Sequence, residues 1–270
     1  MQEKSALGRA MAMVADLRER CPWDRVQTRE TLRPYLIEEV HELDHAIAGG
    51  DPAEVRREVA DLLLHLAWQL VLAEERNEFS AADVAADLEH KMKRRHPHLF
   101  DLGPKEPWET LKKKEGVRGV LDGLPPNLPE LLLAYRLGER AAAVGFDWPD
   151  ATGPVAKVRE ELTEVEGALA GGDRDALDHE IGDLLFSVVN VARKVGIAPG
   201  PALERANARF RSRFGGVERL AAERGVDLNG AGLERLDELW SEVKAAGDPR
   251  SEVRAEGDFR SEVRAVGDPR

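Results

Sequence analysis

Five acidic residues occur twice in this chain with the same spacing. The first set lies in EEVHE (38–42) and EVAD (58–61), and the second in EELTE (160–164) and EIGD (180–183). A Gly-Gly-Asp turn signal separates the two segments of each set. Carboxylates three residues apart share one face of a helix, where like charges repel one another. Such a face needs either open solvent or a bound cation.

An antiparallel helical hairpin, with its turn at Gly-Gly-Asp, would bring the two segments of each set together. The predicted facing pairs are Glu39 with Asp61, Glu42 with Glu58, Glu161 with Asp183 and Glu164 with Glu180. The apolar runs that follow, DLLLHL and DLLFSVV, place these seams near a core. A hard divalent cation with oxygen ligands, such as Mg²⁺, would offset the repulsion. Zinc fits less well, because neither set offers cysteine or paired histidine.

Two alternatives compete with this interpretation. The first is a solvated charged face, which we disfavour because we expect these carboxylates to lack basic partners on their own helices. The second is a di-iron bundle, since Glu38-x-x-His41 has the required spacing. The second set has Thr163 in place of His41 and Ser187 in place of His65, so a site that needs the histidines could exist in one half at most.

The duplication extends beyond the acidic residues, because residues 36–70 align with 158–192 without a gap. Helical periodicity runs nearly throughout, and no segment reads convincingly as a strand. We therefore predict an all-α fold with two tandem helical bundle domains. The expected divisions are a first domain at 1–121, a Pro-rich linker at 122–129, a second domain at 130–246 and a low-complexity tail of decapeptide repeats at 247–270.

Composition limits the function classes. The net charge is -12, which argues against a general nucleic-acid binder or membrane-surface binder. We see no signal peptide and no run of about 18 apolar residues, so we expect no membrane span. The single cysteine, Cys21, excludes an intrachain disulfide and fits a cytoplasmic location.

A phosphate-bearing substrate would also need cations from the protein. Basic runs follow each acidic hairpin, and a tryptophan lies four residues before a lysine near the end of each half. The alternatives are an ordinary charged face and tryptophans that pack in the core. The candidate substrate-binding residues are Lys91, Arg95, Trp108, Lys112, Asn207, Arg209, Arg213, Trp240 and Lys244.

These segments resemble the MazG family of all-α nucleoside triphosphate pyrophosphohydrolases. The resemblance rests on EExxE followed by ExxD, on CPWDRVQTRETLRPYLIEEVHEL and RRHPHLF in the first half, and on GDLLFSVVNVAR and NARFRSRF in the second. It covers about residues 1–245. It implies Mg²⁺-dependent hydrolysis of nucleoside triphosphates to the monophosphate and pyrophosphate, with Mn²⁺ as a possible substitute metal. It also implies broad base specificity, a role in clearing unwanted nucleotides, and a homodimer.

The resemblance also implies roles for particular residues. Glu38 and Glu160 would support the site or orient water, Arg209 and Arg213 would hold phosphates, and Trp240 and Lys244 would lie near the nucleotide. The metal ligands would be Glu39, Glu42, Glu58 and Asp61 in the first half and Glu161, Glu164, Glu180 and Asp183 in the second. One departure is Arg209, where the family commonly has lysine. The second half is usually credited with activity.

Two other functions remain open from the sequence. One is a pyrophosphohydrolase that acts on a single nucleotide. The other is a helical interaction protein in which the acidic seams are remnants or metal staples.

Overall fold

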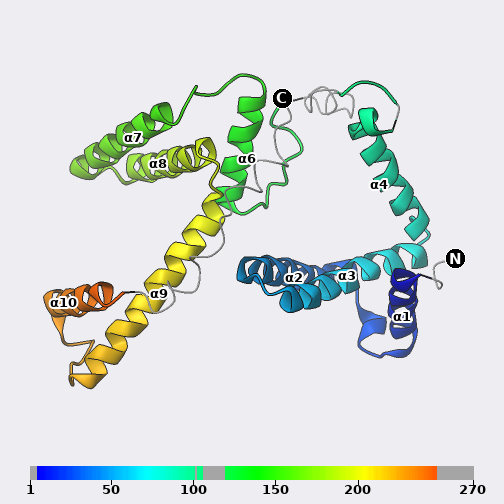
Figure 1. Ribbon diagram of the computed structural model, residues 1–270, viewed down its shortest axis with the longest axis horizontal. Coiled ribbons are helices and arrows are strands. Elements are labelled where there is room, and N and C mark those ends of the chain that lie inside the picture. The colour runs from blue at the N-terminus through cyan, green and yellow to red at the C-terminus, as the bar shows by residue number, and fades with distance from the viewer. Residues whose placement is uncertain (1–4, 101, 106–118, 248–270) are drawn as a thin grey trace. The chain divides into compact units, whose positions relative to one another are not determined.

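The computed structural model describes residues 5–100, 102–105 and 119–247, and within these ranges every regular element is a helix (Figure 1). The predicted all-α class is confirmed. The chain divides into two compact units, residues 1–105 and 106–270. The segment at 122–129, predicted as the linker, belongs to the second unit and contains no helix. Trp108, Lys112 and the tail from residue 248 lie outside the described residues.

The first unit centres on a helical hairpin. Its helices are α1 (Ala6–Arg20), α2 (Arg29–Gly49), α3 (Pro52–Glu75) and α4 (Ala81–Arg95), with short 3₁₀ turns η2 (Asp24–Val26) and η3 (Pro97–Leu99). Gly50 ends α2 with φ of 77°, a left-handed conformation that glycine adopts without strain. Asp51 then caps α3 by accepting a hydrogen bond from the backbone N–H of Ala53. The predicted turn at Gly-Gly-Asp is therefore correct.

The second unit repeats this arrangement. Its helices are α6 (Glu130–Ala143), α7 (Thr152–Gly171), α8 (Arg174–Lys194), α9 (Pro199–Glu223) and α10 (Gly232–Ala245). The α7–α8 hairpin turns at Gly172, whose φ is 68°, and Asp173 caps α8. Helix α6 packs against α8 and α9, and α10 packs against α9. The two hairpins, α2–α3 and α7–α8, carry the two acidic sets.

Each unit has a small apolar core, which lies beside the hairpin in the first unit and between α9 and α10 in the second. In the first unit, α1, α2 and α3 bury Val14, Leu32, Ala67, Trp68, Val71 and Leu72. In the second unit, the described core joins α9 to α10 through Val217, Ala221 and Leu239. Burial of apolar area stabilises a fold by about 25 cal/mol per Å², so these clusters stabilise the contacts between the helices that they join.

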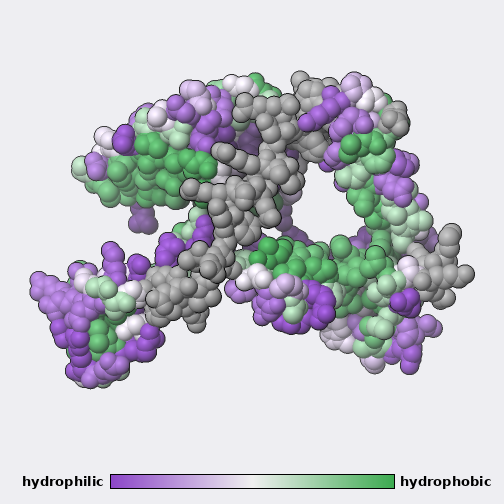
Figure 2. Space-filling view, in the orientation of Figure 1, coloured by the Kyte–Doolittle hydropathy of each residue, from purple (hydrophilic) through white to green (hydrophobic). Residues whose placement is uncertain are grey.

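The hairpins also leave apolar side chains on the surface, as the green areas over α2–α3 and α7–α8 in Figure 2 show. Examples are Ile37, Val40, Val59 and Leu66 in the first unit, and Leu162, Leu169, Ile181, Leu185 and Val188 in the second. All of these residues are more than a third exposed. A contiguous apolar face of this kind marks a surface that another protein surface can cover.

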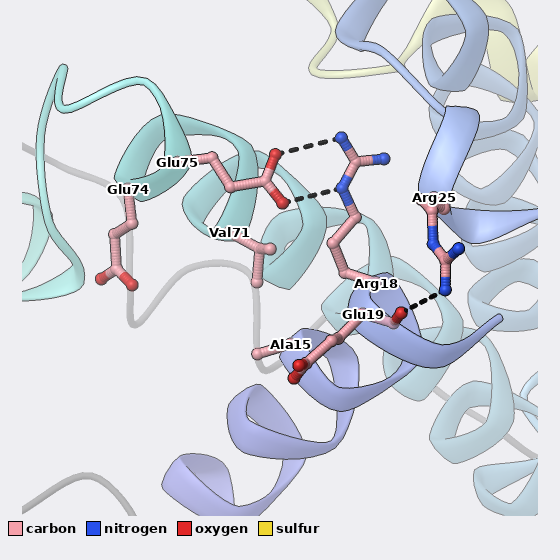
Figure 3. A pocket seen from close by; sticks show the side chains of 7 residues that line it. All are labelled: Ala15, Arg18, Glu19, Arg25, Val71, Glu74 and Glu75. Atoms are coloured by element: carbon pink, nitrogen blue, oxygen red, sulfur yellow. Dashed lines mark hydrogen bonds and ion pairs between the residues drawn. The ribbon is translucent and has the colours of Figure 1, made fainter. Parts of the chain in front are cut away.

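Arg18 ties α1 to α3 in the first unit (Figure 3). Its guanidinium binds both carboxylate oxygens of Glu75, at 2.7 and 3.0 Å, and also donates to the backbone carbonyls of Asp24 and Gln27. A groove of about 520 Å³ lies here, lined by Ala15, Arg18, Glu19, Arg25, Val71, Glu74 and Glu75. Because the donors of Arg18 are engaged in these bonds, we assign this junction a structural role in holding α1 against α3.

Candidate metal centres

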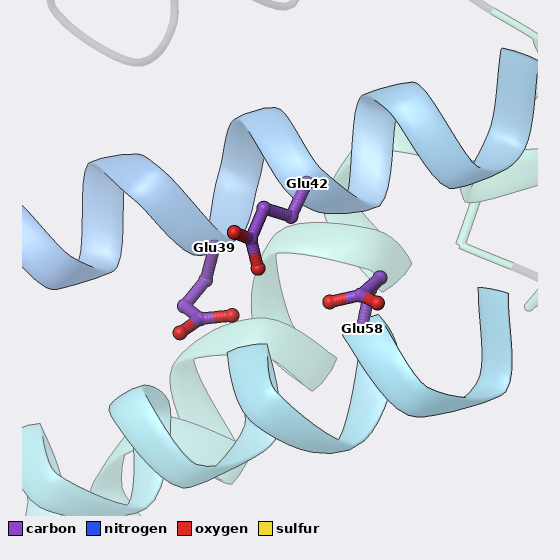
Figure 4. Close-up of side chains that lie close together, drawn as sticks. All are labelled: Glu39, Glu42 and Glu58. Carbon is purple, nitrogen blue, oxygen red and sulfur yellow. The ribbon is translucent and has the colours of Figure 1, made fainter. Parts of the chain in front are cut away.

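The first acidic set forms a group of three carboxylates across the α2–α3 seam (Figure 4). Glu39 and Glu42 project from α2 and Glu58 from α3. One oxygen atom of each lies within 4.8 Å of the others, so a single ion could contact all three. The predicted convergence of these residues is thus present.

Glu39 is the strained member of this group. Burial raises the pKa of its carboxyl, and the negative charges of Asp61, Glu42, Glu58 and Glu38 raise that pKa further. Its Oε2 atom is buried and has no hydrogen-bond partner among the described residues. An unpartnered oxygen that faces other carboxylates is the kind of atom that a cation would stabilise.

His65 lies directly beside Glu39 without neutralising it. Its side chain is 8% exposed, and Nε2 lies 3.9 Å from Oε1 of Glu39. Burial lowers the pKa of the imidazole, which favours its uncharged form. Its Nδ1 atom has no hydrogen-bond partner among the described residues. His65 is therefore a buried residue of the seam.

An open groove of about 610 Å³ lies beside the first carboxylate group. Its lining residues are Glu38, His41, Glu42, His45, Ala46, Glu54, Arg57 and Glu58. The candidate metal-binding seam and the surface that a polar ligand could occupy are thus adjacent.

The second acidic set forms an equivalent group on α7 and α8, namely Glu161, Glu164 and Glu180. Here the expectation that no basic residue would partner the carboxylates is wrong. Lys157 lies one turn before the set on α7, and its Nζ atom is 2.7 Å from Oε1 of Glu160 and 2.7 Å from Oε1 of Glu161. The i,i+3 and i,i+4 spacing that allows this was visible in the sequence.

Lys157 changes the protonation of the second group. Its ammonium lowers the pKa of the Glu161 carboxyl, whereas the hydrogen bond with Glu161 raises the pKa of Glu164. The two adjacent carboxyls therefore differ: the ionised form is favoured at Glu161, and the protonated form is favoured at Glu164. Glu161 is 3% exposed, so its ionised form depends on the lysine.

The two predicted aspartate ligands lie outside these groups of three. Asp61 is exposed, although its charge still acts on Glu39. Asp183 is also exposed and lies 3.4 Å from Nε2 of His179, one turn earlier on α8. Glu38 and Glu160, which were expected to support the site or orient a water molecule, are exposed residues beside the two groups.

The basic and aromatic candidates lie on other helices of each unit. Lys91 and Arg95 belong to α4, Asn207, Arg209 and Arg213 to α9, and Trp240 and Lys244 to α10. Trp240 packs against Phe210 at 5.4 Å between ring centroids and against the α9–α10 core. Core packing, the alternative considered for a tryptophan, thus applies to it at least in part.

The donor sets suit a hard divalent cation. Both groups offer carboxylate oxygens alone, which is the chemistry of Mg²⁺ and Mn²⁺ sites. The buried, unpartnered oxygen of Glu39 fits such an ion directly. In the second group the oxygens also fit, provided that Lys157 releases Glu161. The chain therefore carries two candidate metal centres of similar geometry and different counter-charge.

Comparison with known proteins agrees with this geometry. The model of the MazG nucleotide pyrophosphohydrolase domain matches residues 27–100 and 153–213, which contain the two carboxylate hairpins. The chain belongs to the MazG family, and the expectation of a nucleoside triphosphate pyrophosphohydrolase is confirmed at the level of enzyme class.

Two curated relatives cover most of the chain. A nucleoside triphosphate pyrophosphohydrolase of Escherichia coli (strain K12) is 39% identical over 247 residues, which span 87% of this chain and 94% of the relative. The nucleoside triphosphate pyrophosphohydrolase/pyrophosphatase MazG of Thermotoga maritima is 39% identical over 236 residues, 85% of this chain and 91% of the relative. In the described part of the chain, no helix is long and apolar enough to span a membrane.

Proposed function

We propose that this protein hydrolyses nucleoside triphosphates to the monophosphate and pyrophosphate, using Mg²⁺ or, as a substitute, Mn²⁺. The observation that carries the proposal is the pair of three-carboxylate groups at equivalent positions of two hairpins, one with a buried and unpartnered glutamate oxygen. The names of the two relatives support the same activity. A solvated charged face does not explain a carboxylate oxygen that is buried without a hydrogen-bond partner among the described residues.

In this proposal Glu39, Glu42 and Glu58 hold the metal in the first half, and Glu161, Glu164 and Glu180 hold it in the second. Asp61 and Asp183 complete the two sets by a change of side-chain rotamer. When bound, the metal would neutralise phosphate charge and supply an activated water for attack on the α-phosphorus. Glu38 and Glu160, exposed beside the groups, would orient that water.

The remaining candidates would serve the nucleotide. Arg209 and Arg213, one turn apart on α9, offer guanidinium groups for phosphate oxygens. Trp240 and Lys244 on α10 would lie near the base and the phosphates. Lys91 and Arg95 on α4 are the first-half counterparts, together with Trp108 and Lys112. The carboxylates would hold the metal in place, whereas the metal and the arginines would offset the phosphate charge and align the phosphates for in-line attack.

Broad base specificity and a role in clearing excess or noncanonical nucleotides belong to the same proposal. The groove beside the first group is open and polar, which places few demands on the shape of a base. A panel of all common NTPs and dNTPs tests this point. Turnover of one nucleotide alone would favour a narrow-specificity enzyme.

We further propose that the protein is a cytoplasmic homodimer. The exposed apolar side chains on both hairpins support self-association, because a second copy could cover them. Light scattering after size exclusion distinguishes a dimer from a monomer, and a monomer at micromolar concentration would count against the proposal.

The test of the activity is product identification in H₂¹⁸O. Attack on the α-phosphorus places ¹⁸O in the monophosphate and leaves pyrophosphate unlabelled. The double variant Glu39→Gln, Glu161→Gln serves as the negative control, since each group loses one oxygen ligand. Release of NDP and inorganic phosphate would overturn the proposed reaction. Absence of turnover with any nucleotide would favour a non-catalytic interaction protein.

A further inference from the structure

The two carboxylate groups differ in what balances their most buried glutamate. In the second group the ammonium of Lys157 lies 2.7 Å from Glu161, which is 3% exposed, and 2.7 Å from Glu160. The lysine therefore supplies the positive charge that the group needs without a metal. It also contacts one oxygen atom of Glu161, a member of the second carboxylate group.

The first group lacks this internal cation. The position equivalent to Lys157 is Tyr35, whose ring makes an edge-to-face contact with Trp23. The charges that act on Glu39 come from four other carboxylates, and its Oε2 atom is buried without a partner among the described residues. The side chain of His65 is more than nine-tenths buried, points at Glu39 and leaves Nδ1 unpartnered. The site is thus arranged for an added cation.

We propose that the two halves take up metal in different ways: the first group binds a free divalent cation, whereas Lys157 excludes a free cation from the second group until a metal–nucleotide complex displaces it. This inference rests on the proposed function, because it assumes that both groups are metal centres. A free ion that binds Glu161 must displace the ammonium of Lys157. The ion itself offers that ammonium no new hydrogen-bond acceptor. A nucleotide brings phosphate oxygens that can accept the hydrogen bonds of the released ammonium.

The proposal predicts that the first group binds its metal before the nucleotide arrives. The second group binds its metal together with the nucleotide. The first centre would then remain metal-loaded under conditions in which the second is empty. Removing the positive charge of Lys157 should make the second centre resemble the first. Introducing a lysine at Tyr35 should make the first resemble the second.

The experiment measures binding of Mn²⁺, by the loss of its free EPR signal, to the full chain without nucleotide. The parent should bind one Mn²⁺ tightly, and Glu39→Gln should remove that site while Glu161→Gln should keep it. Lys157→Met should tighten the second site by about tenfold or more, because a full positive charge leaves the neighbourhood of the ligands. Tyr35→Lys should weaken the first site. Lys157→Gln is a second variant in case the methionine disturbs folding.

A matched control is Lys93→Met, which removes a lysine from an exposed i,i+4 pair with Glu89. It changes the net charge equally and should leave Mn²⁺ binding as in the parent. Identical isotherms for Lys157→Met, Lys93→Met and the parent would overturn the inference. Loss of the tight site in Glu161→Gln, with retention in Glu39→Gln, would also overturn it.

Hydrolysis by the same parent sample separates this inference from the proposed function. Turnover of nucleoside triphosphate with unchanged Mn²⁺ isotherms in the lysine variants would reject the inference and leave the proposed function in place. The expected isotherms without turnover of any nucleotide would support the two modes of metal uptake and reject the enzyme activity.

Discussion

Asp147 accepts two hydrogen bonds from the guanidinium of Arg193, at 2.6 Å from Nη2 and 3.2 Å from Nη1. Lys194 adds a third contact to the same carboxylate at 3.0 Å. These bonds join the turn after α6 to the end of α8, the helix that carries Glu180. Because the side chain of Arg193 is only 8% exposed, Asp147 provides the negative charge that compensates its guanidinium. The pair therefore fixes the frame of the second carboxylate group.

The first prediction is that Asp147→Asn lowers the free energy of unfolding by about 2 kcal/mol, since a buried guanidinium loses a charged partner. Urea denaturation measures it. Asp16→Asn, which breaks an exposed pair with Arg20, should change the same quantity by at most about 0.5 kcal/mol. Equal effects of the two substitutions would show that the Asp147–Arg193 pair is not a structural tie.

The same pair predicts a pH dependence. The hydrogen bond with Arg193 is the main cause that lowers the pKa of Asp147 from 3.8 to about 2. A carboxyl with a lowered folded-state pKa contributes stability above its unfolded pKa and loses that stability as pH falls through the folded value. The free energy of unfolding of the parent should thus fall by about 2 kcal/mol between about pH 4 and pH 2. The Asp147→Asn variant should lack this fall, because it has no carboxyl to protonate at that position. Denaturation curves of both proteins should converge in that range, and parallel curves would contradict this account.

The two halves should respond in opposite ways to loss of their buried glutamate when metal is absent. Glu39→Gln should raise the melting temperature in EDTA, because four carboxylates repel Glu39. Glu161→Gln should lower it, because Glu161 pairs with Lys157. Glu38→Gln and Glu160→Gln are matched exposed controls with smaller expected shifts. Thermal melts in which both buried-site variants shift in the same direction would exclude the difference in counter-charge.

A fourth prediction concerns the division of activity between the halves. Glu161→Gln or Asp183→Asn should reduce kcat/KM for nucleoside triphosphates by at least about tenfold, since a lost ligand misplaces the metal. The equivalent changes Glu39→Gln and Asp61→Asn should cost less. Steady-state assays at saturating Mg²⁺ give the comparison, and equal losses from both pairs would show that the halves share the reaction.

The sequence was most informative where a local pattern determines a local structure. A Ser80–Asp83 capping box begins α4, and both Gly-Gly-Asp turns close their hairpins as expected. Periodicity placed three glutamates of each set on facing helices, and the duplication pointed to two equivalent groups. The cap and the turns depend on residues within one or two turns of each other, and the facing of the glutamates follows from the hairpins that those turns close.

What the sequence did not reveal depends on side-chain choice among competing partners. Lys157 stands at partner spacing from Glu160 and Glu161, yet spacing does not say whether a flexible lysine points into the seam or into solvent. Asp183 faces Glu161 by hairpin geometry but lies beside His179 instead. Aspartate is one methylene shorter than glutamate and reaches less far across a seam. Such outcomes depend on packing and electrostatics in three dimensions.

The last prediction concerns the close packing of α9 against α10, the helix that carries Trp240. A Cβ atom at Gly216 would lie 2.7 Å from Cγ1 of Val243, closer than side chains tolerate. Gly216→Ala should therefore lower the free energy of unfolding by about 1–3 kcal/mol. Adding Val243→Ala removes the clashing methyl groups, so the double variant should be more stable than the sum of the single changes predicts.

The control for this pair is Gly167→Ala within α7, where no atom outside the helix backbone lies within 4 Å of the added Cβ among the described residues. That change should raise stability by about 0.5–1 kcal/mol, because alanine restricts the unfolded chain more than glycine does. Urea denaturation of the parent, Gly216→Ala, Val243→Ala and the double variant provides the double-mutant cycle. If Trp240 serves the nucleotide, Gly216→Ala should also raise KM for the triphosphate, and Val243→Ala should restore it. A strictly additive cycle would mean that α9 and α10 adjust freely, and the close approach would then have no role in positioning Trp240.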